Sequence, residues 1–288
     1  MPLSQYVSWW RARTAEPLWY AKDWHVVREC AAGRDAYSVP PHFADDWLNA
    51  HCDRHGKNDY RFVYLGPQVV YGWFLCTNNN NNSTLSITQG TWTPMHADVL
   101  RSYSWSANVA GTKRWMLVPP WATPLLYDAD GVHMARTLPD AYSMSGAGGM
   151  AAAAAGATWP GPNALVASGI AATVVQGPGD ALFVPSGWHH VVYNATDVLS
   201  INHNWFNRYN AGYVVRHMQA ELQAAAAEIE DCRALCDEDE FQALVRRNAG
   251  ACACVYIGWC RQCPQGINVG MPLEELEGLL QDDGEFWC

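Results

Sequence analysis

The sequence TPMHAD at residues 93–98 decides the fold, because it sets a histidine and a carboxylate two positions apart. In an extended segment, the side chains of His96 and Asp98 leave the same face of the strand. An imidazole and a carboxylate on one face can hold one side of a metal ion. The rest of the site must come from another strand, and the best source is VPSGWHH at residues 184–190.

This second stretch offers two neighbouring imidazoles, His189 and His190. Adjacent strand residues face opposite sides, so only one of the two can reach a metal shared with the first stretch. Two histidines and one carboxylate form the facial triad of non-haem Fe(II) oxygenases, which leaves coordination positions open. The alternative is that His96 and Asp98 are exposed polar residues of an edge strand.

The segments that follow both stretches have the pattern of β-hairpins. Residues 101–120 predict a strand, a tight turn at Gly111, and a second strand that begins with Lys113. Residues 191–205 predict two more strands joined by an Asn-containing turn. Short strands with Gly and Pro turns, and ligands from distant strands, predict a mainly β fold with helical additions. We expect a double-stranded β-helix (jelly roll, cupin-like) core plus C-terminal helices.

These motifs together resemble the Jumonji-C family of 2-oxoglutarate oxygenases, and the likeness covers residues 5–70 and 90–220. The motifs are His96-x-Asp98, Gly111-x-Lys113-Arg-Trp, Val184-Pro-x-Gly-Trp-x-His190 and Ser200-Ile-Asn-x-Asn204. Longer blocks are similar to one branch of that family, known for hydroxylating a lysine of the eukaryotic translation-termination release factor. Those blocks are KDWH at 22–25, FADDWLN at 43–49, DYRFVYLGP at 59–67 and SINHNW at 200–205.

The resemblance implies the cofactor Fe(II) and the co-substrates 2-oxoglutarate and O₂. The family's ligand ends its Gly-x-x-His run, so the implied iron ligands are His96, Asp98 and His190. Lys113 would meet the distal carboxylate of 2-oxoglutarate, because a compact ammonium suits a point-charge contact. Thr93, three residues before His96, would add a hydroxyl donor to the same carboxylate.

Five further residues are candidates for the co-substrate pocket. Tyr64 stands where related oxygenases place a tyrosine that binds the co-substrate. Ser106, Asn108, Asn202 and Asn204 lie on strands that face the predicted pocket, where buried amides need hydrogen-bond partners. The alternative for each is an ordinary one: a tyrosine of the core, or a strand residue that the backbone satisfies.

We expect three regions in the chain. Residues 1–58 form an N-terminal helical and extended segment that packs on the barrel, which the resemblance implies is shorter than in the family. Residues 59–210 form the catalytic barrel, with inserts near 68–90 and 121–165. The first insert contains a five-Asn run, and this run is predicted to be a loop. Residues 211–288 have helical spacing of apolar residues, and their helices are a candidate homodimer interface.

The composition limits the classes of partner. With 288 residues, 49% hydrophobic and 16% charged, the chain is globular and not disordered. A net charge of −10 without any Lys or Arg run disfavours nucleic acid and fits a basic protein partner. We see no charged-then-apolar leader and no apolar run that could span a bilayer, so we expect no membrane association. The expected location is cytoplasmic, with nuclear presence open.

The function that these expectations favour is protein lysyl hydroxylation with the release factor as substrate. The alternatives are a Jumonji-type histone lysine demethylase and a catalytically inactive cupin-like binding protein. A lysine substrate needs a carboxylate or an aromatic cage near the mouth. The candidates are Tyr103, Trp105, Asp45 and Asp46. A separate hypothesis is a structural zinc site formed by Cys252, Cys254, Cys260 and Cys263.

Overall fold

The computed structural model describes residues 2–12, 19–33, 35–56, 59–68, 74–77, 83–86, 91–129, 131–138 and 161–249. The chain divides into two compact units. The first consists of Met1–Ser38, Arg61–Asp98 and Ser104–His203, and the second of Val39–Tyr60, Val99–Tyr103 and Asn204–Cys288. The cysteines of the proposed zinc site lie outside the described residues, as does much of the predicted insert at 121–165.

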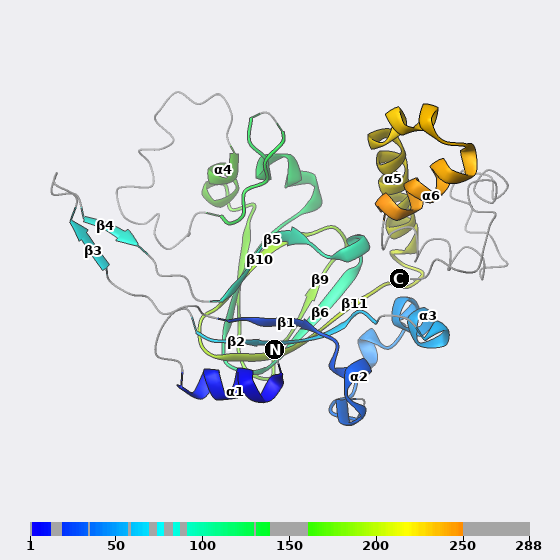
Figure 1. The fold of residues 1–288 in the computed structure, drawn as a ribbon. Helices are drawn as coiled ribbons and strands as arrows, with labels where there is room; N and C mark the ends of the chain where they lie inside the picture. The colour runs from blue at the N-terminus through cyan, green and yellow to red at the C-terminus, as the bar shows by residue number, and fades with distance from the viewer. Residues whose placement is uncertain are drawn as a thin grey trace. The chain divides into compact units, whose positions relative to one another are not determined.

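Two β-sheets form the first unit (Figure 1). The five-stranded sheet has the order β1 (Ala21–Trp24), β2 (Arg61–Gly66), β11 (Val198–Trp205), β6 (Tyr103–Ala110) and β9 (Ala181–Val184). The four-stranded sheet has the order β5 (Trp92–Ala97), β10 (His189–Asn194), β7 (Lys113–Val118) and β8 (Ala172–Gln176). Neighbours in these sheets pair antiparallel. The predicted double-stranded β-helix core is confirmed.

The four-stranded sheet is covered by apolar groups on both faces, because its strands carry apolar residues on both sides of the alternation. On one face, Trp115 and Val192 pack with Val184 of the other sheet. On the opposite face, Val118 and Val191 pack against two short helices, η4 (Pro120–Leu126) and α4 (Gly161–Ala167). Full burial of each such side chain contributes about 1.5–3 kcal/mol. The sheet is therefore held rigidly from both sides.

The N-terminal segment is tied to the five-stranded sheet. In α1 (Leu3–Ala12), the hydroxyl of the buried Tyr6 donates to the carbonyl of Leu65 on β2, at 2.5 Å. The short helices α2 (Val26–Glu29) and η1 (Ala31–Gly33) follow β1. Residues 2–33 thus contain helices and one strand in the unit of the barrel, whereas Val39–Tyr60 belong to the second unit.

The first insert contains two short strands on either side of the Asn run, for which the sequence predicted a loop. β3 (Phe74–Thr77) and β4 (Ser83–Ser86) pair antiparallel on either side of the Asn run (Figure 1), with Phe74 opposite Ser86. Ladder pairing satisfies backbone groups that a loop would leave to water. The Asn run at 78–82 lies outside the described residues.

Helices form most of the second unit. They are η2 (Pro41–Phe43), α3 (Trp47–His55), η3 (Val99–Arg101), α5 (Ala211–Glu228), η6 (Glu230–Leu235) and α6 (Glu238–Ala249). Asp46 caps α3, since its carboxylate accepts from the backbone N–H of Asn49 at 2.9 Å. The core of the unit includes Phe206, Val214 and Met218, the last two at helical spacing. The predicted C-terminal helices are therefore confirmed as far as residue 249. Within the described ranges, no helix is long and apolar enough to cross a membrane.

Candidate active site

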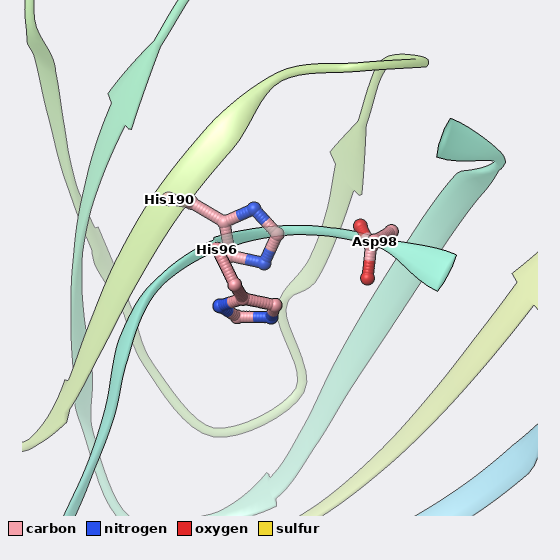
Figure 2. Close-up of side chains that lie close together, drawn as sticks. All are labelled: His96, Asp98 and His190. Atoms are coloured by element: carbon pink, nitrogen blue, oxygen red, sulfur yellow. The ribbon is translucent and has the colours of Figure 1, made fainter. Parts of the chain in front are cut away.

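A direct strand pair brings the predicted metal ligands together. β5 and β10 are antiparallel neighbours, and their register sets His190 opposite His96. Paired residues share a face of the sheet, so both imidazoles leave it on the same side. Asp98 follows the end of β5. The ligand atoms of His96, Asp98 and His190 all lie within 4.8 Å of one another, and Figure 2 shows the three side chains converging. A single divalent ion can be shared by such a set.

Backbone carbonyls orient both imidazoles. The Nδ1 atom of His96 lies 2.8 Å from the carbonyl oxygen of Pro94, and that of His190 lies 3.3 Å from the carbonyl oxygen of Trp188. A carbonyl can only accept, so each Nδ1 carries the proton and donates it. The lone pair is then on Nε2, which is the tautomer that a metal needs.

Burial also keeps the second imidazole neutral. The pKa of His190 is lowered to about 4, chiefly by desolvation; the charge of Asp98 opposes this shift and nearby His96 adds to it. A neutral imidazole at physiological pH is competent as a ligand, because no proton competes for Nε2. The sequence left His189 and His190 as alternatives by geometry. The structure turns His189 to the other face, where its Nδ1 lies 3.2 Å from Oγ1 of Thr123.

A serine supports the carboxylate. Oγ of Ser104, on β6, donates to Oδ2 of Asp98 at 2.7 Å. Ser104 is buried, so its own hydroxyl is held in place by the packing of the sheet. This contact fixes one carboxylate oxygen and leaves the other for a metal. Hydrogen bonds to ligands of this kind tune metal affinity, and sequence reasoning did not identify Ser104.

A buried cation lies in the same unit. Lys113 is 3% exposed, and its Nζ donates to Oγ of Ser200 at 2.5 Å. Because Lys113 is on the four-stranded sheet and Ser200 on the five-stranded one, the ammonium points between the sheets. Nζ also lies 5.3 Å from the ring centroid of Tyr64 and 5.7 Å from that of Trp115. Ring centroids of Trp115 and His190 are 5.5 Å apart, so the cation is close to the metal ligands.

No carboxylate balances this ammonium within the described part of the chain. Desolvation therefore lowers the pKa of Lys113 to about 7. A buried cation without a counter-ion fits an acidic ligand, whose carboxylate would restore the charge balance. Ser200 was not among the predicted residues, although it shares a strand face with Asn202 by period-two spacing.

The phenol of Tyr64 lies beside this cation, and the ring of Tyr20 packs on that of Tyr64, with 6.1 Å between the centroids. The hydroxyl of Tyr64 donates to Oδ1 of Asp23 at 2.9 Å, and burial followed by the charge of Asp23 raises its pKa well above the usual value. The hydroxyl proton of Tyr64 is therefore donated to Asp23, and not to a co-substrate as the sequence predicted. The hydroxyl of Tyr20 is hydrogen-bonded to the side chains of Thr93 and Asn194, and burial raises its pKa to about 12. Tyr20 thus links Thr93 to the pocket, a role the sequence did not indicate.

The remaining predicted polar residues divide between the two units. Ser106 is buried, and its hydroxyl has no hydrogen-bond partner among the described residues. The amide of Asn108 donates to the carbonyl of Gly111 at 2.5 Å, while its Oδ1 atom likewise lacks a partner among the residues that are described. Asn202 is buried two positions from Ser200 and so shares its strand face. Asn204 belongs to the second unit, where its amide donates to Oγ of Ser102 at 3.4 Å.

The residues proposed as a lysine cage have other contacts. The ring of Trp105 packs on His203, with 4.3 Å between centroids, and that of Tyr103 packs on Trp205, at 5.0 Å. Asp46 caps α3, and Asp45 accepts from the indole N–H of Trp47. These contacts are local packing and helix capping, which short sequence patterns do not distinguish from a binding role.

Comparison with known proteins gives consistent matches. Residues 65–211 match the Cupin-like domain family. The chain is 35% identical over 272 residues to Arginine-specific demethylase JMJ20 of Arabidopsis thaliana, which covers 87% of this chain and 49% of that protein. It is 36% identical over 249 residues to 2-oxoglutarate and iron-dependent oxygenase JMJD4 of Gallus gallus, covering 84% and 50%. The Homo sapiens JMJD4 is 36% identical over 239 residues, covering 81% and 49%. The chain spans about half the length of the curated relatives it matches.

Proposed function

Since the chain belongs to the cupin-like JmjC domain family, we propose that it is an Fe(II)- and 2-oxoglutarate-dependent oxygenase that hydroxylates a lysine side chain of a protein. The observation that carries this proposal is the convergence of His96, Asp98 and His190 near the buried ammonium of Lys113. The first three supply the facial triad, and the fourth supplies the cation that a dicarboxylate needs.

The residues fit both groups. His96 and His190 offer Nε2 atoms and Asp98 offers a carboxylate oxygen, which is the donor set that non-haem Fe(II) prefers. When bound, Fe(II) and 2-oxoglutarate supply O₂ activation, in which the keto acid becomes succinate and CO₂ and one oxygen atom enters a substrate C–H bond. The protein orients these groups and excludes water, and it needs no titrating base for the step.

The pocket walls select the co-substrate. Lys113 would hold the distal carboxylate of 2-oxoglutarate, with Ser200 orienting the ammonium and Thr93 lying on β5 of the same sheet as Lys113. The unpartnered hydroxyl of Ser106 fits a further polar contact with the co-substrate or with water. Trp115 lies near both His190 and Nζ of Lys113, so its buried indole lines the space between the cation and the candidate ligands. In such a site a single charge pair is far stronger than in water.

The substrate that we propose is the eukaryotic translation-termination release factor. It is supported by the sequence resemblance and by 36% identity to the JMJD4 oxygenases. A cytoplasmic location and a homodimer through the C-terminal helices stay predictions. Light scattering after size exclusion tests the dimer, since a mass equal to one chain would contradict it.

The test begins without oxygen. Binding of Fe(II) and of 2-oxoglutarate is measured by calorimetry, and a release-factor domain is then incubated with the loaded protein and O₂. The expected product is a lysine heavier by one oxygen atom, found by peptide mass spectrometry. His96→Ala should abolish both iron binding and product, while His189→Ala, one position from a ligand, is the matched control. Binding of both small molecules without that product would contradict lysyl hydroxylation and leave the oxygenase assignment standing.

A second candidate is oxidative demethylation, which the 35% identity to the demethylase JMJ20 favours. Hydroxylation of an N-methyl group releases formaldehyde, so the same pocket serves both reactions. Methylated lysine and arginine peptides from histone tails separate them: the demethylase predicts loss of one methyl group from the peptide. Failure to bind iron or 2-oxoglutarate would instead favour the inactive binding protein.

A further inference from the structure

The backbone of β1 is distorted at one residue. Asp23 has φ of +57°, and it is one of three described non-glycine residues with positive φ. The register of β1 on β2 shifts here, since Ala21 lies opposite Leu65 and Trp24 opposite Val63. The extra residue is a β-bulge, which re-aims a side chain. A left-handed backbone is costly for a residue with a Cβ atom, and such strain is concentrated at functional sites.

The bulge directs the carboxylate of Asp23 toward the pocket wall. Its Oδ1 atom accepts the hydroxyl proton of Tyr64 at 2.9 Å, and the ring of Tyr64 lies 5.3 Å from Nζ of Lys113. Both Asp23 and the metal ligand Asp98 raise the pKa of Tyr64, so this phenol is close to both carboxylates. Asp23 is therefore one side chain away from the candidate active site.

The same carboxylate is accessible from solvent. The side chain of Asp23 is 53% exposed, and among the described residues the ion pair of its Oδ2 atom is with the exposed ammonium of Lys22, at 3.7 Å. An exposed ion pair of this kind contributes little and is easily displaced. Tyr64 thus fixes one oxygen while the other stays available at the rim. An asparagine would anchor Tyr64 equally well through its amide oxygen, so anchoring alone does not explain a negative charge here.

We propose that Asp23 determines substrate specificity by binding the cationic head group of the target side chain, a lysine or an arginine. This inference rests on the proposed function and adds the residue that recognises the charge. The side chain of a lysine or arginine extends past the carbon that reacts, and its ammonium or guanidinium lies beyond that carbon. The charge therefore needs a partner separate from the metal ligands. Asp23 is such a partner, because it is negative, oriented by Tyr64 and open to an incoming chain.

The test uses the full chain loaded anaerobically with Fe(II) and 2-oxoglutarate, and reads binding instead of turnover. The probes are pools of heptapeptides, randomised except for a central lysine, arginine, glutamine or norleucine. Immobilised protein is incubated with each pool, and retained peptides are quantified by mass spectrometry. The wild type should retain the lysine or arginine pool about tenfold more than the norleucine pool, the size typical of a charged hydrogen bond. Asp23→Asn should remove that preference.

Two further variants sharpen the result. Asp35→Asn removes the same charge from another exposed carboxylate and should keep the preference for cationic pools. Asp23→Gly relieves the positive φ, which offsets the loss of the acceptor for the Tyr64 hydroxyl, so it should fold about as well as the wild type and still lose the preference. A loss in Asp23→Gly together with an unchanged or raised melting temperature excludes misfolding as the cause.

The outcomes distinguish this inference from the proposed function. Retention of the cationic preference in Asp23→Asn would overturn the role of Asp23. A wild type that binds 2-oxoglutarate but shows no preference for cationic pools would also overturn it, and would leave the oxygenase assignment intact. A wild type that binds neither Fe(II) nor 2-oxoglutarate would overturn both.

Discussion

Replacing Lys113 by methionine should stabilise the protein and abolish binding of 2-oxoglutarate. The ordinary lysine pKa of 10.5 falls to about 7 on burial. The folded pKa is lowered, so the charged lysine opposes folding; the penalty is complete below pH 7 and disappears as pH rises to 10.5. At about 1.36 kcal/mol for each pH unit, the full penalty is about 5 kcal/mol. Loss of the donor to Ser200 costs about 1 kcal/mol, which leaves a net gain of about 4 kcal/mol at pH 6.

The assay is urea unfolding of wild type and Lys113→Met at pH 6, 8 and 10, without metal or co-substrate. The gain in free energy of unfolding should shrink steadily between pH 7 and 10. The matched control is Lys22→Met, because Lys22 is exposed and its substitution should change stability little at any of these pH values. A Lys113→Met protein no more stable than wild type at pH 6 would refute the claim of an unbalanced buried charge.

The same charge predicts the pH dependence of co-substrate binding. Only the ammonium form of Lys113 attracts a carboxylate, so affinity for 2-oxoglutarate should fall about tenfold for each pH unit above 7. Calorimetry in buffers of different ionisation enthalpy should also detect proton uptake on binding at pH 8. An affinity that stays constant from pH 6 to 9 would contradict this role of Lys113.

Three further predictions concern the ligands and one buried histidine. His190→Ala should lose stoichiometric Fe(II), measured by metal analysis, whereas His189→Ala should retain it, because only His190 joins the ligand cluster. Ser104→Ala should weaken Fe(II) binding about tenfold to a hundredfold in calorimetry, since Asp98 loses its hydrogen-bond donor. Burial, then the charge of Arg61, lowers the pKa of His203 to about 3, so this histidine has no pH-dependent effect on stability above pH 6.5 and opposes folding increasingly as pH decreases toward 3. In urea unfolding, His203→Gln should therefore lose about 3 kcal/mol less free energy of unfolding than the wild type between pH 6.5 and 4.5.

The sequence was informative about the fold because its local patterns agree with one another. Alternation and turn residues predicted β6 and β7 around Gly111, which has φ of +81° in the structure. Helical spacing predicted α5 from Ala211. The spacing of two positions between His96 and Asp98 fixed a shared face, so one half of the candidate site could be read directly. The strands β3 and β4 were not predicted, because they are short and their pairing depends on a partner strand and not on local sequence.

The supporting residues could not be predicted, because the fold brings them together from distant positions. Ser104 meets Asp98 across two strands, and Ser200 meets Lys113 across two sheets. Nothing near Asp23 in the sequence indicates a bulge, since the shift arises where β1 meets β2. Trp105 is of a residue type that forms cages around cations, yet it packs on His203. Spacing determines which residues share a face, while only the tertiary structure determines what that face meets.

The position of β5 has a consequence for the mechanics of the sheet. β5 is an outermost strand that pairs along one side with β10, and beyond that pairing the backbone N–H of Met95 donates to the carbonyl of Arg136 at 2.7 Å. His96 and His190 lie opposite each other on this single pair of strands. An ion bound by both would therefore link β5 to β10 and oppose the separation of β5 from the sheet. Metal binding would link two residues that are distant in the sequence. Because the fold already holds them together, the entropic cost of this link in the folded state is small. Amide exchange along β5, slow with the ion and fast without it, would then report occupancy of the centre.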